Sequence, residues 1–274
     1  MMLDALHDSA AALLNFEMMS RYGWRLVDGI WITTQVVTLS VTLGFLIAFL
    51  VCRARMSRNR MLSGAAISYI TFFRGTPLLC QLYLVYYGAG EIRPLLTNLG
   101  VWWLFREAFV CCVFAFSLNT AAYQAEIMRG ALSSVPKGQV EAAAALGLSQ
   151  FRISRHVIWP QAFIVALRPF GNELIAMIKS SALAAIVTLL DLMGETRFIF
   201  ARTFDFLIYV YAAIIYLVIV EIIRRVWGLI ERSCSRHLIV AAGETQSRGQ
   251  DEGRISRTGR HGLSHGGAPQ GQRA

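Results

Sequence analysis

Five apolar runs, each about as long as a bilayer core is thick, constrain the fold of this chain most strongly. A helix needs about 20 mainly apolar residues to cross the hydrocarbon core of a membrane. Runs of that length lie at residues 30–51, 61–87, 108–128, 162–190 and 206–227. Only 16% of the residues are charged, whereas soluble domains have about a quarter. We therefore predict an all-α integral membrane protein with five transmembrane helices.

The distribution of arginine predicts how these helices are oriented. Short loops rich in Arg and Lys mark the cytoplasmic side of a membrane protein. Four arginines lie between residues 53 and 60, and further basic residues lie in 129–160 and 224–236. The loop 88–107 contains only two basic residues. This pattern places the N-terminus outside and the C-terminus inside. The net charge of +9 thus belongs to membrane loops and the tail, and it does not indicate a nucleic-acid partner.

Composition divides the chain into three parts. Residues 1–28 carry acidic groups before the first apolar run and no basic stretch, so they are expected to form an N-terminal periplasmic segment and not a cleaved signal peptide. Residues 29–236 form the predicted transmembrane domain. Residues 237–274 are rich in Gly, Ser, Arg and Gln, and such a composition predicts a disordered cytoplasmic tail.

The chain carries no pattern typical of a catalytic or metal site. Its five cysteines show neither a disulfide framework nor Cys/His ligand spacing. The apolar runs hold no paired Ser/His or Asp/Asp, which an intramembrane protease would need. We expect no catalytic residue, no metal and no enzyme activity in this chain.

The loop 134–160 is the most informative stretch outside the apolar runs. Pro136 suits a helix start, and the residues that follow include four consecutive alanines at 142–145, which form helix well. Gly147 can end that helix in the left-handed conformation, Ser149 can cap a second short helix, and Pro160 is expected to bound it. Such a loop can lie on lipid headgroups, but small side chains favour docking into a groove of a soluble partner.

The spacing within this loop resembles the EAA loop of the permease subunits of ATP-binding-cassette importers. The residues that carry the resemblance are Glu141, Ala142, Ala143, Gly147, Val157 and Pro160. Val157 and Trp159 replace the family's Ile and Leu with other apolar residues. The resemblance implies that Glu141, Ala142, Ala143, Gly147 and Pro160 couple this chain to an ATPase.

Four further segments resemble polar amino acid permeases, the last two of them the histidine and opine permeases most closely: 73–79, 117–123, 171–175 and 179–183. The resemblance covers 29–236 and implies a subunit of the bacterial inner membrane that imports polar, cationic amino acids or opines. It also implies two ATP-binding subunits, a second permease that is a paralogue, and a periplasmic amino-acid-binding protein. Neither Lys137 nor Lys179 follows a glycine, as a P-loop requires, so ATP is expected on the partner subunits and no cofactor on this chain.

Polar residues inside the apolar runs need a reason, because a charge at mid-bilayer costs at least a few kcal/mol. Glu173, beside Asn172, either faces the translocation path and pairs with the cationic end of the substrate or binds a neighbouring helix. Lys179 either pairs with Glu173, which we favour, or contacts the substrate carboxylate. Asn119 and Glu126 are seven residues apart, near one helix face. They are expected to pack helices first, with Asn119 also a candidate for the path.

The second apolar run is interrupted by Arg74-Gly75-Thr76-Pro77. Pro77 removes a backbone donor and Gly75 loosens the chain, so a kink is predicted there. The kink is either a fixed bend or a hinge for alternating access.

A different kind of protein, a secondary amino acid transporter driven by an ion gradient, would also have apolar runs of this kind. It usually has more spans and inverted repeats, and it would give the Glu141–Gly147 pattern no purpose.

Overall fold

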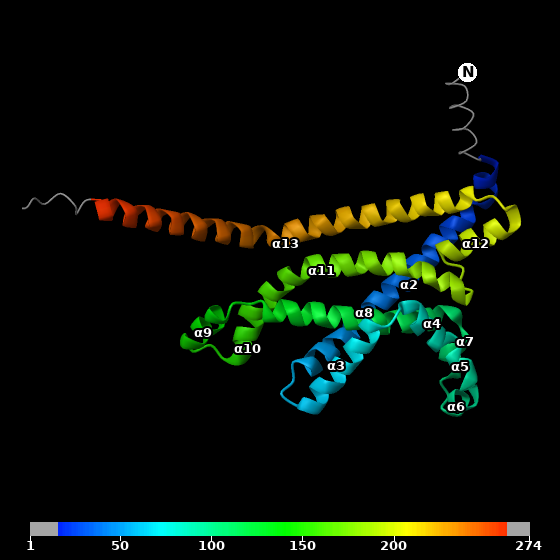
Figure 1. The fold of residues 1–274 in the computed structure, drawn as a ribbon, viewed down its shortest axis with the longest axis horizontal. Coiled ribbons are helices and arrows are strands. Elements are labelled where there is room, and N and C mark those ends of the chain that lie inside the picture. The colour runs from blue at the N-terminus through cyan, green and yellow to red at the C-terminus, as the bar shows by residue number, and fades with distance from the viewer. Residues whose placement is uncertain (1–15, 262–274) are drawn as a thin grey trace, which may run out of the picture. The chain divides into compact units, whose positions relative to one another are not determined.

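The computed structural model describes the backbone of residues 16–261 and the side chains of residues 19–234, and within these ranges it is helical, with no strand. Figure 1 labels the helices along the chain. They are α2 Phe16–Arg55, α3 Arg60–Gly75, α4 Leu78–Tyr86, α5 Gly88–Glu91, α6 Arg93–Asn98, α7 Trp102–Arg106, α8 Ala108–Ser133, α9 Lys137–Ala145, α10 Gln150–Ile153, a π-helical turn Ser154–Ile158, α11 Trp159–Ser180, a 3₁₀ helix Ser181–Val187, α12 Leu192–Thr203 and α13 Leu207–His261. Of the described residues, 16–227 belong to one compact unit and 228–261 to another.

Four helical segments are long and apolar enough to cross a membrane: Met19–Arg55, Ala108–Ser133, Gln150–Val187 and Leu207–Cys234. Each of them covers most or all of one of the five predicted runs. The remaining run, 61–87, is divided into α3 and α4, with Thr76 and Pro77 in extended conformation between them. Proline has no N–H to continue the ladder and clashes with the preceding turn, so the predicted interruption is confirmed.

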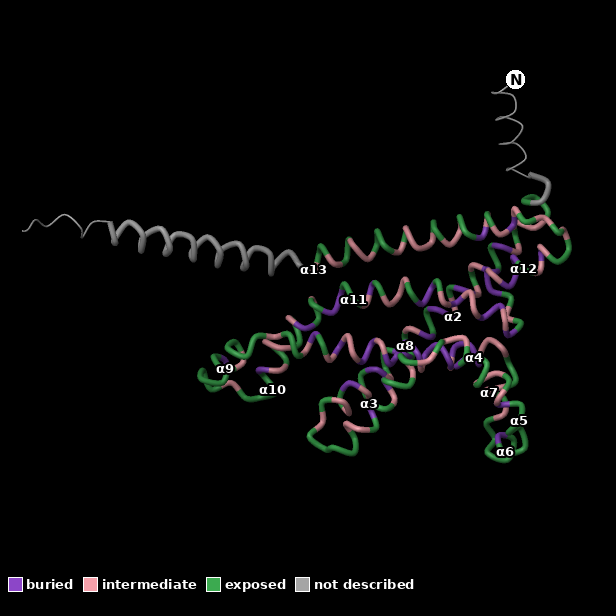
Figure 2. Tube along the Cα trace, in the orientation of Figure 1, coloured by how far each residue is buried: buried purple, intermediate pink, exposed green. Residues whose placement is uncertain are grey.

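Helix α8 lies at the centre of the first unit. It packs against α2, α3, α4 and α11, and buried residues are concentrated along it (Figure 2). Helix α2 approaches α8 closely at Gly44, where a Cβ atom would collide with the methyl group of Thr120 and lie 3.2 Å from the carbonyl oxygen of Ser117. Small residues let two helix backbones approach closely, so glycine at this position seats α2 on α8.

Two predicted boundaries are corrected by the structure. The first helix begins at Phe16, inside the segment 1–28 that was expected to precede the membrane domain. The fourth helix does not start near residue 162, because the chain is helical from Gln150 onwards. Pro160 therefore does not bound the second short helix. It lies in the first turn of α11, where a missing N–H is tolerated, and a π-type hydrogen bond from the Trp159 N–H to the Ser154 carbonyl joins that turn to α10.

The segment 191–205, which separates the fourth and fifth apolar runs, contains α12. Asp191 caps this helix by accepting a hydrogen bond from the Gly194 N–H at 2.9 Å, and burial raises the pKa of the Asp191 carboxyl to about 6 against the opposing effect of its hydrogen bonds. Arg25 of α2 forms a 2.9 Å ion pair with Glu195. The Arg25–Glu195 pair holds α12 on α2 and joins residues far apart in the sequence.

The C-terminal helix is longer than its apolar run. Where the sequence predicts a disordered tail from residue 237, the structure continues the backbone of α13 to His261. Each added residue contributes one backbone hydrogen bond once a helix exists, and this stretch contains Arg, Gln, Glu and Ala, which favour helix. The remainder of the predicted tail, 262–274, lies outside the described residues, as do residues 1–15 of the predicted periplasmic segment.

Candidate functional site

The candidate coupling loop is a short helix closed by a left-handed glycine. Gly147 has a φ of 77°, as its place after the helix predicts. Its N–H donates to the Ala144 carbonyl at 2.9 Å, and the Leu148 N–H donates to the Ala143 carbonyl at 3.2 Å. This pair of bonds is the Schellman arrangement, which satisfies carbonyls at a helix end. The end of α9 is therefore held by hydrogen bonds within the loop itself.

The outer surface of this loop is apolar and uncovered in the chain. Glu141 and Ala142 are exposed, Leu146 is 83% exposed and Phe151 is 74% exposed. Ala143 is different, because it is buried against the chain itself. Large apolar side chains at this level of exposure on a short, ordered element are typical of a protein contact.

The second short helix begins as predicted, although its cap differs. Ser149 occupies the N-cap position in extended conformation, but its hydroxyl forms no capping bond. The Ile153 N–H instead donates to the Ser149 carbonyl at 2.9 Å. The first turn is held by backbone hydrogen bonding.

Polar side chains from two helices hold the interruption between α3 and α4. The carbonyl of Phe73 loses its usual i+4 donor because residue 77 is proline. Asn119 of α8 donates to that carbonyl at 3.0 Å, and Gln81 of α4 donates to it at 2.9 Å. Asn119 also donates to the Gln81 side-chain oxygen at 3.0 Å. Gly75, the other residue of the predicted hinge, is exposed, and a Cβ there would meet nothing within 4 Å.

Glu173 is bound to the central helix. Thr120 of α8 donates a 2.7 Å hydrogen bond to the Glu173 carboxylate, while the neighbouring Asn172 is exposed. Among the side chains of residues 19–234 no ion pair joins Glu173 to Lys179, so the expected pairing is wrong. Six residues of helix turn a side chain about 120° away, which leaves Lys179 exposed at the end of α11.

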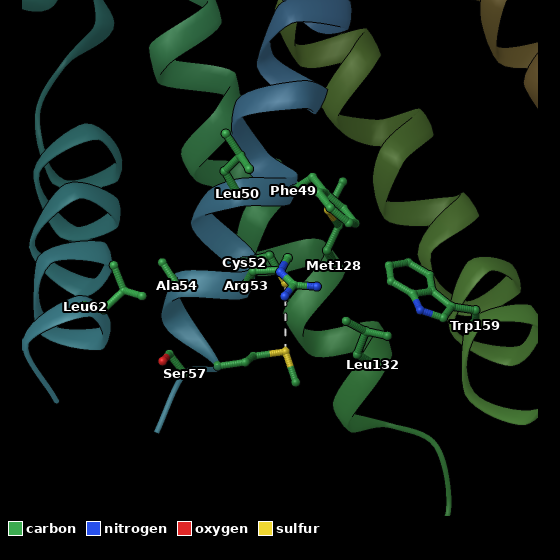
Figure 3. Close-up of a pocket in the computed structure, with 11 residues that line it drawn as sticks. Phe49, Leu50, Cys52, Arg53, Ala54, Ser57, Leu62, Met128, Leu132 and Trp159 are labelled. Carbon is green, nitrogen blue, oxygen red and sulfur yellow. Dashed lines mark hydrogen bonds between the residues drawn. The ribbon is translucent and has the colours of Figure 1, made fainter. Parts of the chain in front are cut away.

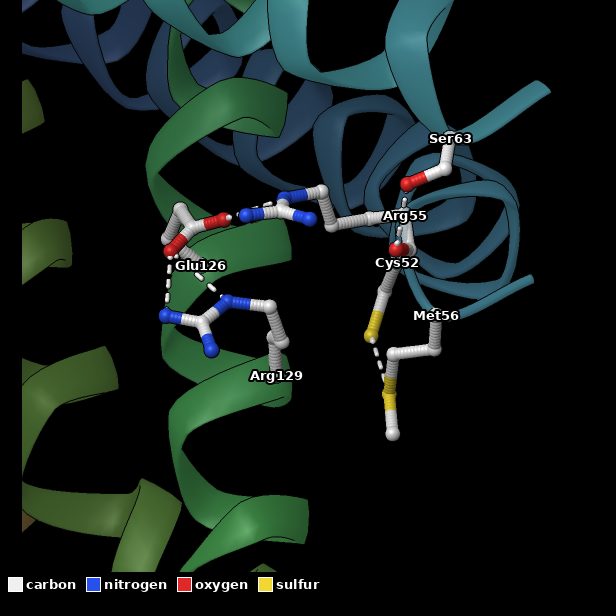
Figure 4. A network of polar contacts seen from close by, with 6 residues as sticks. All are labelled: Cys52, Arg55, Met56, Ser63, Glu126 and Arg129. Carbon is white, nitrogen blue, oxygen red and sulfur yellow. Dashed lines mark hydrogen bonds and ion pairs between the residues drawn. The ribbon is translucent and has the colours of Figure 1, made fainter. Parts of the chain in front are cut away.

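A second polar group lies where α2 and α8 end (Figure 4). The Glu126 carboxylate of α8 is 2.8 Å from Arg129 on its own helix and 3.7 Å from Arg55 on α2. Glu126 thus joins two helices, the packing role that its position suggests. It lies near the start of the coupling loop, because α8 ends at Ser133 and α9 begins at Lys137.

Sequence reasoning missed two polar residues of this interior, Gln81 and Thr120. A signal for Gln81 was present: Pro77 frees the carbonyl of Phe73, and a buried carbonyl needs a donor. The fold supplies that donor from Gln81 as well as from Asn119. Thr120 gives no comparable signal, since threonine is ordinary in a membrane helix.

Comparison with known proteins identifies a family and several proteins whose sequences are similar to this chain. Residues 40–236 match the family described as binding-protein-dependent transport system inner membrane component. The nopaline transport system permease protein of Agrobacterium fabrum is 36% identical over 222 residues, 81% of this chain and 92% of that protein. The arginine ABC transporter permease protein of Escherichia coli is 38% identical over 164 residues, 60% of this chain and 73% of that protein.

Solved structures share the fold. A chain of an amino acid ABC transporter crystallised with histidines has a TM-score of 0.72 and 34% identity, over 80% of this chain and 98% of that one. A chain of an inward-facing methionine ABC transporter has a TM-score of 0.63 at 19% identity, over 78% of this chain and 97% of that one.

Proposed function

This chain belongs to the family of binding-protein-dependent transport system inner membrane components, and from that membership we propose that it is the permease subunit of an ATP-driven importer for polar, cationic amino acids or opines. The relatives named for nopaline and arginine transport support this substrate class. Both ligands carry a guanidinium group and a carboxylate, so a path for them needs groups that tolerate charge inside the membrane.

The α9 loop is the observation that carries the proposal. Its backbone is closed by Gly147, and its apolar surface at Leu146 is uncovered in this chain. A short helix with small side chains fits a groove on another protein. Glu141, Ala142 and Gly147 would contact one of two ATP-binding subunits, which bind the ATP, while Ala143 is buried against the chain itself and Pro160 lies in the first turn of α11.

The proposed topology has five spans in the bacterial inner membrane, with the N-terminus outside and the C-terminus inside. Helices α3 and α4 together make the second span, since their combined length matches the apolar run 61–87. The arginines at 53–60 then lie on the same side as the α9 loop, as the positive-inside rule demands. The assembly is completed by a second, paralogous permease and a periplasmic amino-acid-binding protein.

The proposed substrate path runs along α11. Glu173 offers the carboxylate for the cationic end of the substrate, and Asn172 and Lys179 are exposed on the same helix, where Lys179 can contact a substrate carboxylate. Asn119 is left with the structural role, because both of its contacts are within the chain.

Uptake by proteoliposomes that hold the full assembly tests the proposed function. Radiolabelled arginine, histidine and an opine should enter only with ATP and the binding protein, and ionophores should not change the rate. Uptake that ignores ATP and follows an ion gradient would establish the secondary-transporter alternative instead.

Replacing Glu173 by glutamine should weaken uptake of cationic substrates about tenfold or more, seen as a raised KM, since a hydrogen bond to a charged group contributes about 1.5–3 kcal/mol. Thr120→Val is the matched control. It removes the 2.7 Å hydrogen bond to Glu173 but keeps the carboxylate. Equal losses in the two variants would show that Glu173 only binds α8.

A further inference from the structure

A pocket separate from the proposed path lies where α2 ends, α3 begins and α8 ends. Its volume is about 540 Å³, and Leu50, Arg53, Leu62, Met128, Leu132 and Trp159 are among its lining residues. In the view of Figure 3, the guanidinium of Arg53 lies between Trp159 on one side and Leu62 on the other. None of the residues proposed for coupling or for the substrate path lines this pocket. On the α11 side its lining residue is Trp159, which precedes Pro160.

The walls of the pocket are apolar and continue onto the outer face of α2. Leu50 is 67% exposed and Leu62 is 49% exposed. Leu43 and Leu46, which precede Leu50 on the same side of α2 at helical spacing, are exposed as well. Phe49 stacks on Trp159 with ring centroids 6.2 Å apart. An acyl chain lying on α2 could therefore enter the pocket without leaving an apolar surface.

The charge at the mouth of the pocket is positive and is not neutralised by the described side chains. Arg53, Arg58 and Arg60 are exposed, and none of them forms an ion pair within residues 19–234. The nearby acid, Glu126, is already shared by Arg129 and Arg55. Arg53 is the basic residue among those that line the pocket, and Arg58 and Arg60 lie in the chain between the lining residues Ser57 and Leu62.

We propose that this α2–α3 pocket binds one anionic phospholipid, with its phosphate on Arg53 and one acyl chain among the apolar side chains. Basic pockets between transmembrane helices on the cytoplasmic side bind anionic headgroups. Guanidinium groups match phosphate oxygens, and tryptophan lies at the membrane–water interface. A soluble subunit matches this site less well, because the apolar walls continue onto an exposed apolar face of α2 within the first apolar run. The inference goes beyond transport and needs only the membrane topology.

Native mass spectrometry of the full assembly in nanodiscs tests the proposal, with phosphatidylglycerol competing against phosphatidylcholine. Wild type should retain phosphatidylglycerol preferentially. Arg53→Gln should reduce that retention about fivefold, because a basic residue near an anionic surface contributes about 1 kcal/mol, and Arg53→Lys should keep most of it. Ala54→Phe, which fills the pocket without changing its charge, should also lose the lipid.

Arg106→Gln is the matched control, since Arg106 is exposed, with its side chain at 63%, and precedes α8 at the opposite end from the pocket. It should bind lipid as wild type does. Equal retention in wild type, Arg53→Gln and Ala54→Phe would overturn the proposal. So would a photo-crosslinker at Leu62→Cys that labels a protein subunit and not a lipid. These readouts do not involve transport, so they can fail while the importer function stands.

Discussion

Replacing Gly147 with valine is expected to remove most ATP-driven uptake while the chain still inserts and assembles its helices. The φ of 77° at this residue lies in the left-handed region, which costs an ordinary residue about 1–2 kcal/mol and is a genuine outlier for a β-branched one. An energy of that size changes an equilibrium about five- to thirtyfold. The turn would relax, and α9 would leave the position in which it meets the ATPase. Uptake and co-purification of the ATP-binding subunit measure the effect.

Gly147→Asn separates the turn from the surface. Asparagine tolerates the left-handed region, and a Cβ at this position would meet nothing within 4 Å in this chain. This variant should therefore keep most of the uptake. If the asparagine and valine variants fail equally, close approach of the ATPase and not the turn explains the glycine. If both transport normally, α9 does not couple to an ATPase.

Asn119→Leu is expected to have the second large effect, on stability as well as on transport. Asn119 is only 6% exposed, and its amide donates to the Phe73 carbonyl and to the Gln81 side chain. Leucine leaves the Gln81 oxygen without that donor, and a buried unsatisfied group costs about 1–3 kcal/mol. The thermal midpoint of the assembly in lipid should fall by several degrees, and uptake should fall with it.

Asn98→Leu is the matched control, because Asn98 is exposed at the end of α6, and it should leave both measurements unchanged.

Pro77→Ala should have a mild effect on uptake and stability, since Gln81 and Asn119 continue to donate to the Phe73 carbonyl. In the double variant the alanine N–H can donate to the Phe73 carbonyl in place of Asn119, so Pro77→Ala should offset the part of the Asn119→Leu loss that comes from this carbonyl, while the Gln81 oxygen stays without its donor. Additive losses would show that the two residues do not share this carbonyl. Normal transport by Pro77→Ala would also mean that residue 77 is not the pivot of a hinge.

The parts of this fold that could be predicted are those decided by neighbours in the sequence. The apolar runs, the interruption at Pro77 and the left-handed Gly147 each follow from a few adjacent residues. The start of α11 could not be predicted in the same way. A proline is common at the start of a helix, so Pro160 suggested a boundary. The π-helical turn Ser154–Ile158 instead makes the chain helical from α10 into α11.

The contacts within the polar interior depend on which helices meet. Lys179 lies about 120° around α11 from Glu173, and Thr120 of α8 binds Glu173 instead, because α8 packs on α11. The position of α12, between the fourth and fifth apolar runs, likewise depends on a partner far away in the sequence. It is held by Arg25 across 170 positions of sequence, and no local pattern contains that information.

The unbroken helix from Gln150 to Val187 has a mechanical consequence. At about 1.5 Å of rise per residue, Gln150 at the coupling loop and Glu173 are separated by roughly 35 Å of continuous helix. A push on α10 would reach the level of Glu173 without crossing a loop. Compliance along that distance is concentrated where the hydrogen-bond ladder is irregular, at the π-helical turn Ser154–Ile158 and at Pro169. The stiffness of the helix at these two places therefore determines how much of a displacement of α10 reaches Glu173 and how much is lost as bending of the helix.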